Sequence, residues 1–244
     1  MVAEVLLEGD LLGHPTHGLG LAPLYVRELA TGGMARAGEP RCIADRGAAL
    51  TWDGALLPGP WLLREAISQA TERLKEHPVV TVVIRRSHHS ACLQAYLADV
   101  VARGHMILLA CSDPGHTSVA PFGAVEGVMS PNPIAAGIPS PEGPILLDLS
   151  TSATAFGQVV RAAHAGESLA GPWLITREGA FTADASATLD ERRAALYPLG
   201  GEALGYKGFA LGLLVEALTQ ALGGHGRAVA TDRWSASVFL QLIQ

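Results

Sequence analysis

The stretch from Val79 to Ser112, VVTVVIRRSHHSACLQAYLADVVARGHMILLACS, decides the fold of this chain. Its first residues are mostly β-branched, which predicts a strand over Val79–Ile84. The polar turn Arg85–His89 follows, then a helix from about Leu93 to Arg103 and a second strand over Met106–Cys111. This strand–helix–strand order is typical of an α/β protein.

Further helices and strands are predicted on both sides of this stretch. Apolar residues recur at helical spacing in residues 1–12 and again from Pro60 to Lys75, and Gly32-Gly33 supplies a C-cap for a helix between them. The other predicted elements are a helix over Ala22–Ala30, a strand ending at Asp148, a helix over about Ala155–Ala165, a helix from Gly208 and a strand over Ala236–Ile243. The predicted fold class is therefore mixed α/β, a sheet flanked by helices with a mainly helical N-terminal region.

Three polar turns interrupt the apolar strands beyond this stretch. They read SDPGHTSVAPFG (112–123), SPNPIAAGIP (130–139) and LDLSTS (147–152). In the third turn an apolar strand runs directly into Asp148 and a group of hydroxyl residues, so hydrogen-bonding groups are held at one point of the sheet edge. We therefore expect the three turns to form a rim that binds a polar ligand.

Composition excludes several classes of protein. The chain has 244 residues, of which 49% are hydrophobic, so it can bury a sizeable core. A net charge of −6 with only 17 basic residues argues against nucleic acid as a partner. The 3 cysteines lack CxxC spacing, which favours reduced thiols over a disulfide framework or a zinc site.

The sequence predicts no secretory signal and no membrane span. Glu4, Glu8 and Asp10 interrupt the first apolar residues, and the apolar run Gly208–Gly223 carries Glu216 and is too short to span. We therefore expect a cytoplasmic protein with no membrane partner. Because the chain begins in mid-helix and stops in a strand-like run, we also expect a shortened version of a longer protein.

Histidines are the first candidates for chemistry. His88 and His89 lie where a strand gives way to a helix, and an imidazole there is suited to general acid–base work because it titrates near neutrality. The alternative is that both are solvated loop residues. His17, in HPTHGLG, can hydrogen-bond a substrate carbonyl or carboxylate, or simply cap the preceding helix. No metal site is predicted, because HExxH and CxxC are absent.

Lys207, in LGYKGFALG, lies at the expected entrance of the helix from Gly208. A cation there opposes the helix macrodipole, so a phosphate or carboxylate partner is expected, the alternative being a lysine that points to solvent. Neither GxGxxG after a strand nor GxxxxGK[ST] occurs, which excludes a standard Rossmann phosphate loop and a P-loop.

Taken in order, these segments resemble the malate/L-lactate dehydrogenase superfamily, whose cofactor fold is not a Rossmann fold. The resemblance spans nearly the whole chain and is carried by GHPTHGLGLAPLYVRELATGGM (13–34), SHHSA (87–91), CSDPGHTSVAPFG (111–123), SPNPIAAGIP (130–139), LDLSTS (147–152) and PLGGEALGYKGFALGLLVEALTQALGG (198–224). It implies hydride transfer between NAD or NADP and C2 of a small 2-oxo or 2-hydroxy acid, or the C=N carbon of a cyclic imino acid.

The resemblance also implies roles for individual residues. His89 matches the acid/base histidine, and His17 matches the histidine that helps to hold the substrate. The positions expected to bind the cofactor are Ser112, Asp113, Asn132, Asp148, Leu149, Ser150 and Lys207. Family members are commonly dimers, so the resemblance further implies a homodimer with a small-molecule substrate.

The same resemblance divides the chain by role. It implies a mainly helical, substrate-side region over residues 1–75 and a cofactor-binding mixed-sheet domain over residues 76–244. Family members usually continue beyond the equivalent of Gln244, so the C-terminal part of the family fold is expected to be missing here.

Three residues depart from the family pattern, and one of them is Ala124, which follows Gly123 where the family has a second glycine. Leu21 stands where an arginine would grip the substrate carboxylate, which forfeits a charge-assisted bond of roughly 1.5–3 kcal/mol. Either another cation such as Arg85 or Arg86 replaces it, or the substrate differs. Ala91 replaces a glycine two residues after His89, which is tolerated if that backbone has negative φ.

The function predicted from these observations is an NAD(P)-dependent oxidoreductase of 2-oxo or 2-hydroxy acids such as malate or lactate. A reductase of Δ1-piperideine-2-carboxylate or Δ1-pyrroline-2-carboxylate is the first alternative. A truncated, non-catalytic family member that binds a partner or a nucleotide without turnover is the second. A metal hydrolase that uses the histidines is the least favoured.

Overall fold

A computed structural model describes residues 1–189, 193–229 and 233–244. The chain forms two compact units. Unit 1 comprises Met1–Gly115, Ile134–Leu149 and Ala217–Gln244, and unit 2 comprises His116–Pro133 and Ser150–Glu216.

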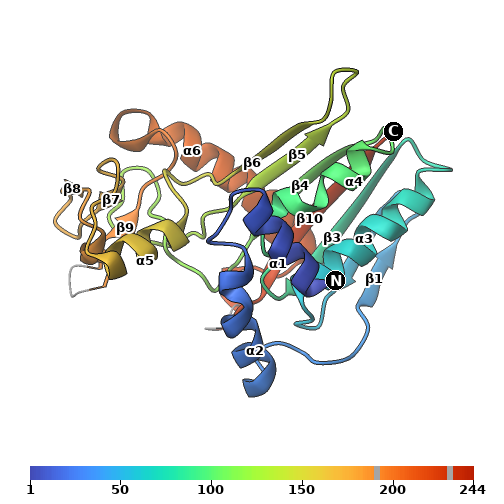
Figure 1. The fold of residues 1–244 in the computed structure, drawn as a ribbon, viewed down its shortest axis with the longest axis horizontal. Coiled ribbons are helices and arrows are strands. Elements are labelled where there is room, and N and C mark those ends of the chain that lie inside the picture. Colours follow the sequence, from blue (N-terminus) through green and yellow to red (C-terminus); the bar gives the residue numbers. More distant parts are fainter. Residues whose placement is uncertain (190–192, 230–232) are drawn as a thin grey trace. The chain divides into compact units, whose positions relative to one another are not determined.

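Unit 1 is built on a seven-stranded mixed sheet (Figure 1). In spatial order its strands are β1 (Arg41–Asp45), β2 (Ala49–Asp53), β3 (Val79–Ser87), β10 (Ala236–Ile243), β4 (Met106–Ser112), β5 (Ile134–Ile138) and β6 (Ile145–Leu149). β2 runs parallel to β3, and the other neighbouring pairs are antiparallel. The last strand in sequence therefore lies between β3 and β4, in the middle of the sheet.

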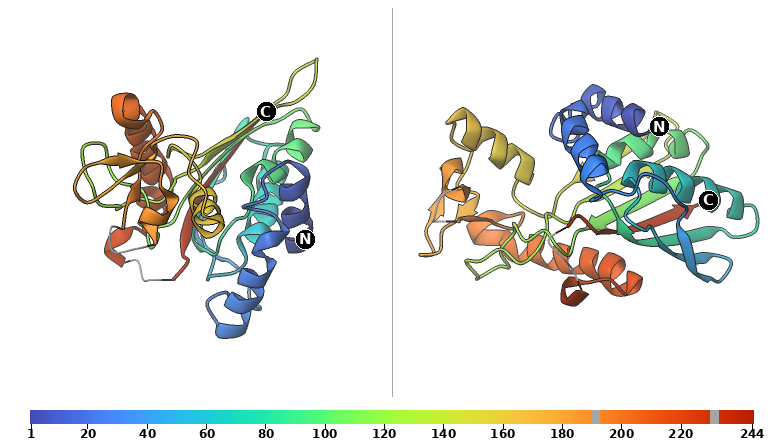
Figure 2. Two further views of the ribbon diagram at one scale, coloured as in Figure 1. Left: turned by 60° about the vertical axis from the view of Figure 1, so that its left-hand side comes forward. Right: turned by 90° about the horizontal axis from the view of Figure 1, so that it is seen from below.

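The helices of unit 1 pack against apolar side chains that occur at every second position of the strands and so share one face of the sheet. Val80, Val82 and Ile84 of β3 are fully buried in one core cluster, together with apolar residues of α1 (Val2–Leu11) and α3 (Gly59–Arg73). α2 (Ala22–Thr31) contributes Tyr25 to that cluster. Figure 2 (right) shows these dark blue to cyan helices on one side of the strands. The β-branched run of β3 thus pairs within the sheet and packs against helices at the same time.

The shorter helical pieces of unit 1 belong to its turns. They are η1 (Leu19–Leu21), η2 (Leu93–Tyr96), α4 (Ala98–Val101), the π-helical stretch η4 (Ala217–Ala221) and η5 (Arg227–Val229). η4 contacts β10, β4 and β3.

One edge of the sheet gathers the ends of four strands. β2, β3, β4 and β6 run in the same direction, so their last residues Asp53, Ser87, Ser112 and Leu149 lie at one edge. The register agrees, because Ser87 pairs with Ala236 and Ser112 with Ser237 at the start of β10. In open α/β sheets ligands bind outside the carboxyl ends of the strands, so this edge is where a site is expected.

Unit 2 has a smaller sheet and two helices. Its strands are β8 (Phe181–Thr182), β7 (Leu174–Ile175) and β9 (Ala195–Leu196), in that spatial order. The helices are α5 (Phe156–Ala165) and α6 (Gly201–Glu216), with the short turn η3 (Ala185–Thr188). Val159, Leu174 and Leu196 are buried together in a separate apolar core.

The predicted fold class is confirmed: the sheet is mixed, helices flank it, and residues 1–31 are mainly helical. The strand over Ala236–Ile243 is confirmed residue for residue. Gly32 caps α2 in the left-handed conformation, with φ of 77°. The assignment of residues 1–75 to the substrate and 76–244 to the cofactor concerns roles, and it stays a prediction.

Two predicted helices are wrong in their extent. The helix over Leu93–Arg103 is two short pieces, η2 and α4, because the Tyr96 hydroxyl donates to the Ser90 carbonyl and holds a tight first turn. The helix expected from Gly208 begins at Gly201. Gly208 does not mark a helix boundary; a Cβ there would lie 2.4 Å from the Leu199 nitrogen, so glycine is needed for close packing.

The corrected start of α6 changes the argument about Lys207. Lys207 lies in the second turn of the helix and not at its entrance, and its side chain is exposed. The expected conflict with the helix macrodipole therefore does not arise, since that effect is confined to the first turn.

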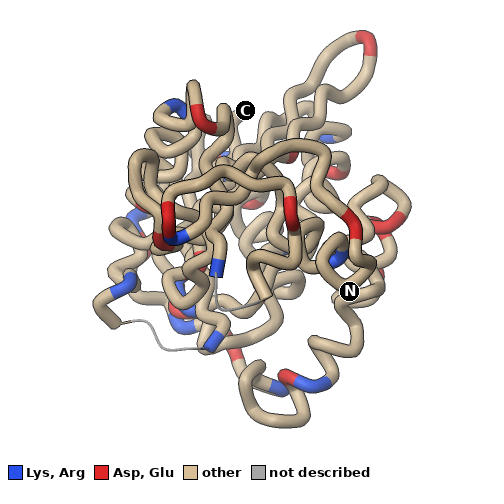
Figure 3. Tube along the Cα trace, turned by 90° about the vertical axis from the view of Figure 1, so that its left-hand side faces the viewer, with Lys and Arg blue, Asp and Glu red and all other residues tan. Residues whose placement is uncertain are grey.

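The placement of charged residues and the apolar character of the helices are both consistent with the composition of the sequence. Along the described part of the trace, basic and acidic residues are interspersed and are not separated by sign (Figure 3). Within the same residues, none of the helices combines the length and the apolar character that crossing a bilayer requires.

Candidate active site

His89 follows β3 at the carboxyl edge of the unit 1 sheet, and Tyr25 of α2 holds its ring. The Tyr25 hydroxyl oxygen lies 2.9 Å from His89 Nδ1 and 2.9 Å from the His89 carbonyl oxygen. The backbone N–H of Ala91 also donates to Nδ1, over 3.2 Å. Burial raises the Tyr25 pKa well above its usual range, so this side chain is a neutral phenol at physiological pH.

These contacts suit both protonation states of His89. A neutral ring with its proton on Nε2 accepts the Ala91 N–H at Nδ1. A ring with a proton on Nδ1 gives up that bond and donates to the Tyr25 oxygen, while the phenol donates to the His89 carbonyl. Because Tyr25 can hold the Nδ1 proton whether or not Nε2 carries one, Nε2 is the nitrogen assigned to proton exchange with a ligand.

Two other rings contact His89. The His17 ring stacks on it at 5.7 Å between centroids, with 18° between the planes, and the Trp234 ring meets it edge-on at 4.9 Å. Burial lowers the His17 pKa, and the neighbouring His14 lowers it further, which favours a neutral imidazole. The structure therefore brings together the two histidines that the sequence identified as catalytic candidates.

The turn that carries His17 is held by the end of α1. Asp10 Oδ2 accepts the Leu19 N–H over 2.9 Å, and Gly18 approaches the Asp10 carboxylate so closely that any Cβ would collide with it. Thr16 Oγ1 lies 2.9 Å from His17 Nδ1. A Cβ at Gly18 would therefore displace the Asp10 carboxylate from its bond to Leu19, and the His17 ring is oriented by Thr16 and by stacking on His89.

His88 is not a solvated loop residue, the alternative that the sequence left open. Its side chain is fully buried, and among the described residues neither ring nitrogen has a hydrogen-bond partner within bonding distance. The nearest charged group is Glu28 of α2, with Oε2 3.6 Å from Nε2. Burial lowers the His88 pKa, and Glu28 opposes this effect.

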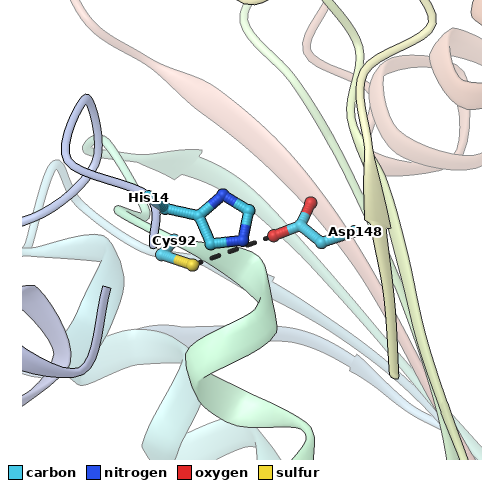
Figure 4. Close-up of side chains that lie close together, drawn as sticks. All are labelled: His14, Cys92 and Asp148. Atoms are coloured by element: carbon cyan, nitrogen blue, oxygen red, sulfur yellow. Dashed lines mark hydrogen bonds between the residues drawn. The ribbon is translucent and has the colours of Figure 1, made fainter. Parts of the chain in front are cut away.

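Asp148, predicted to bind the cofactor, lies near the end of β6 beside two further polar side chains (Figure 4). Asp148 Oδ2 accepts the Gln94 N–H over 2.9 Å and the Cys92 thiol over 3.8 Å. His14 belongs to the same cluster, since its ligand atom and those of Cys92 and Asp148 lie within 4.8 Å of one another. Burial raises the Asp148 pKa, although the Gln94 N–H and His14 oppose the shift.

The other predicted cofactor residues of unit 1 lie at the ends of β4 and β6. Ser112 is buried, and its hydroxyl accepts from the Gln220 amide over 2.6 Å. Asp113 holds the turn, because its two carboxylate oxygens accept the N–H groups of Gly115 and Ser235. Leu149 is exposed.

Three predicted cofactor residues belong to unit 2. Asn132 is buried, with its amide donating to the Gly212 carbonyl and to Glu216. These two bonds tie the turn that contains Asn132 to α6, which is typical of a structural residue. The Ser150 hydroxyl donates to the Ser152 carbonyl over 3.2 Å, and the Lys207 ammonium lies 5.9 Å from the Tyr206 ring centroid.

Arg85 and Arg86, the candidates to replace the missing arginine at Leu21, both pair with Asp53. One nitrogen of each lies 3.2 Å from Asp53 Oδ2. Burial would raise the Asp53 pKa, but the Ala55 N–H and the two arginines outweigh it and hold that pKa below its ordinary value. Leu21 itself packs against the apolar core of unit 1.

Ala91 departs from the condition stated for it. Its φ is 57°, in the left-handed region that disfavours residues with a Cβ. The condition of negative φ is therefore not met, and the turn after His89 carries backbone strain.

We expect Ala91→Gly to raise the free energy of unfolding by about 0.5–1 kcal/mol. Relief of the left-handed strain, roughly 1–2 kcal/mol, exceeds the entropy that glycine adds to the unfolded chain. The midpoint of urea unfolding measures the change, with Ala95→Gly, which has negative φ, as the control that should lose stability. A lower midpoint for Ala91→Gly would contradict the strain argument.

A separate hollow of about 270 Å³ lies elsewhere in unit 1. Its lining includes Trp52, Trp61, Glu39 and Glu65. It contains none of the predicted site residues, so the candidate site is defined by the His89 contacts and not by this hollow.

Four residues of the site were missed by sequence reasoning: Tyr25, Glu28, Gln94 and Trp234. Tyr25 and Glu28 lie within a helical pattern whose repeat identifies a buried face but no partner. Trp234 stands two residues before the last strand. Its place next to the start of that strand is the one feature of the sequence that could have suggested a site residue.

Comparison with known proteins identifies the family. The sequence model of the family described as malate/L-lactate dehydrogenase matches residues 1–241. The chain belongs to the malate/L-lactate dehydrogenase family. An L-lactate dehydrogenase from Cupriavidus necator is 33% identical over 229 residues, 92% of this chain and 64% of that protein.

Two further relatives extend the comparison. The Δ1-pyrroline-2-carboxylate/Δ1-piperideine-2-carboxylate reductase of Pseudomonas syringae pv. tomato is 34% identical over 243 residues, 96% of this chain and 67% of that protein. The structure of a putative malate/lactate dehydrogenase from E. coli superposes with a TM-score of 0.90 at 28% identity, over 99% of this chain and 68% of that one. The chain spans about three fifths of the length of the first curated relatives that it matches in this family.

Proposed function

We propose that this member of the malate/L-lactate dehydrogenase family is an oxidoreductase that uses NAD or NADP to interconvert a small 2-oxo acid and its 2-hydroxy acid. The observation that carries the proposal is the setting of His89, with Nδ1 held by Tyr25 and Ala91 and its ring between His17 and Trp234. The family membership supports the same reaction class.

The residues present suit a nicotinamide cofactor. Asp148 and Ser112 offer a carboxylate and a hydroxyl at the carboxyl edge of the unit 1 sheet, and these groups can accept from or donate to ribose hydroxyls and a carboxamide. The cofactor, when bound, supplies or accepts the hydride. Contacts by Asp113, Asn132, Leu149, Ser150 and Lys207 belong to the same proposal.

In the proposed mechanism His89 moves the proton. As C2 of the oxo acid is reduced, its oxygen gains negative charge, and the imidazolium donates the Nε2 proton to that oxygen, yielding the hydroxyl group. The Nδ1 proton remains shared with the Tyr25 oxygen, so the ring keeps its orientation through the transfer. Neutral His17 donates a hydrogen bond to the substrate. In the reverse direction neutral His89 accepts the hydroxyl proton.

A cyclic imino-acid reductase is the second candidate, favoured by the relative from Pseudomonas syringae. Here the proton would go to nitrogen instead of oxygen. Leu21 does not favour either candidate, because 2-oxo acids and cyclic imino-2-carboxylates both carry the carboxylate that the missing arginine would bind. A homodimer and a cytoplasmic location complete the proposal; three free cysteines accord with a reducing compartment.

The test is a substrate panel. Pyruvate, oxaloacetate and the two cyclic imino acids are added in turn to protein with NADH or NADPH, and the near-ultraviolet absorbance of the reduced nicotinamide is followed. Loss of absorbance with one oxo acid supports the main proposal, and loss with an imino acid alone supports the second candidate. Cofactor binding without turnover on any substrate would support a non-catalytic family member instead.

Tyr25→Phe is expected to lower kcat by about 5–100-fold, because a hydrogen bond of roughly 1–3 kcal/mol to His89 is lost. KM should change less, since Tyr25 orients His89 and does not bind the substrate. The pH–rate profile should shift as well, because the Tyr25 oxygen can accept from the imidazolium and the phenylalanine ring cannot, so the two protonation states are affected unequally. Tyr206→Phe, an exposed tyrosine of α6, is the matched control. An unchanged pH profile would show that Tyr25 is only structural.

A further inference from the structure

Three ligand-type side chains meet in unit 1 from distant parts of the sequence. His14 comes from the turn after α1, Cys92 precedes η2, and Asp148 lies near the end of β6. Figure 4 shows a ring nitrogen of His14 and the Cys92 sulfur both directed toward the Asp148 carboxylate. Because the three residues lie more than fifty positions apart, the spacing rules that predicted no metal site cannot detect this cluster.

The distances suit a single ion. One nitrogen, one sulfur and one oxygen lie within 4.8 Å of one another, and the sulfur–oxygen distance is 3.8 Å. A tetrahedral zinc ion with bonds of about 2.0–2.3 Å places its sulfur and oxygen ligands roughly 3.5 Å apart. The sulfur–oxygen separation is thus close to that of two ligands on one zinc ion.

Gln94 orients two of the three groups. Its backbone N–H donates to Asp148 Oδ2 over 2.9 Å, and its side-chain oxygen lies 2.8 Å from His14 Nε2. Bonds that fix a ligating carboxylate are a regular feature of metal sites. An imidazole nitrogen cannot donate to Gln94 and bind an ion at once, so ligation through Nε2 would replace the His14–Gln94 bond. The same Gln94 side-chain oxygen is placed to act as a fourth donor, or to leave that position to water.

Charge at the cluster also favours a cation. The Cys92 thiol donates to the Asp148 carboxylate, so the proton it shares with that carboxylate occupies the position that a cation would take. Among the described residues no lysine or arginine forms an ion pair with Asp148. A divalent ion would neutralise a thiolate and a carboxylate together.

We propose that His14, Cys92 and Asp148 bind one divalent transition-metal ion of the zinc type. Thiolate and imidazole ligands select zinc over magnesium or calcium, which prefer oxygen. On binding, the Cys92 S–H bond breaks, the sulfur donates its electron pair to the ion, and the proton passes to solvent; nothing is oxidised or reduced. Asp148 is shared with the proposed cofactor site, so the ion and the cofactor would compete for its carboxylate; the metal inference itself does not depend on the oxidoreductase function.

Cobalt and zinc titrations of the full chain test the site. After treatment with a chelator, Co²⁺ should bind with one equivalent and produce the sulfur-to-cobalt charge-transfer absorption of a thiolate ligand, and added Zn²⁺ should displace it. We expect Cys92→Ser to abolish that absorption and His14→Asn to weaken Zn²⁺ binding at least tenfold. Zn²⁺ should also raise the unfolding temperature of the unaltered chain, by mass action.

Cys42→Ser, which removes an exposed cysteine of the same unit, is the matched control and should bind as the unaltered chain does. His14 is only half-buried, so His14→Asn keeps the test valid if Cys92→Ser fails to fold. The proposal is overturned if no charge-transfer absorption appears, if Cys42→Ser abolishes it, or if the folded Cys92 and His14 variants bind Zn²⁺ as tightly as the unaltered chain.

Discussion

Replacing His89 with alanine is expected to lower kcat by about 10²–10⁴-fold, the usual contribution of a positioned acid–base group. The loss should fall on kcat, because His17 and the cofactor residues would still bind their ligands. Steady-state rates with the best substrate of the panel measure it, and quenching of nicotinamide fluorescence shows whether cofactor still binds.

The control for His89→Ala is His164→Ala, an exposed histidine of α5, which should leave the rate unchanged. If His89→Ala binds cofactor and its kcat stays within a factor of three of that of the unaltered chain, His89 is not part of the mechanism. The proposed proton transfer would then be wrong.

Gly59→Ala is expected to have the second largest effect, although Gly59 touches no substrate in the proposal. A Cβ at this first residue of α3 would lie 2.5 Å from the His89 carbonyl oxygen and 2.6 Å from that of His88. Backbone atoms cannot swing aside as a flexible side chain can, so the turn that carries His89 must shift. We expect a loss of about 1–3 kcal/mol of stability, and displacement by about 1 Å can cost 10²-fold in rate.

Gly20→Ala provides the matched control. The nearest atom to a Cβ at Gly20 is the Pro15 carbonyl oxygen at 3.6 Å, an ordinary contact, so stability and rate should change little. Thermal unfolding and kcat are measured on both variants. Gly59→Ala with an unaltered rate would mean that the position of His89 is not critical.

Sequence reasoning succeeded where a local pattern alone determines the structure. The β-branched run of β3 and the apolar run of β10 each predict a strand without knowledge of any partner, and Gly32 caps α2 as its position after the helix indicates. It failed in α6, where Gly205, Gly208 and Gly212 are all buried. There glycine serves close packing, a tertiary property that looks like a helix break when only the sequence is read.

The candidate site shows the same division. His17 and His89 could be selected because both lie in polar turns between regular elements, and the structure stacks their rings. Tyr25 and the Asp148 cluster depend on contacts across 50 or more residues, as in the pair Tyr25–His89 and the bond from Gln94 to Asp148. No periodicity records such pairings, so they become visible only in three dimensions.

The central place of β10 has a consequence for the order of events during synthesis. β3 and β4 each bond to β10 and not to one another, so neither gains its full set of sheet hydrogen bonds until residues 236–243 have left the ribosome. Pairings between segments so far apart form slowly, and the waiting strand edges are open to aggregation in the meantime. We therefore expect nascent chains to rely on chaperones; pulse-labelled hydrogen exchange in which β3 is protected before β10 would contradict this order.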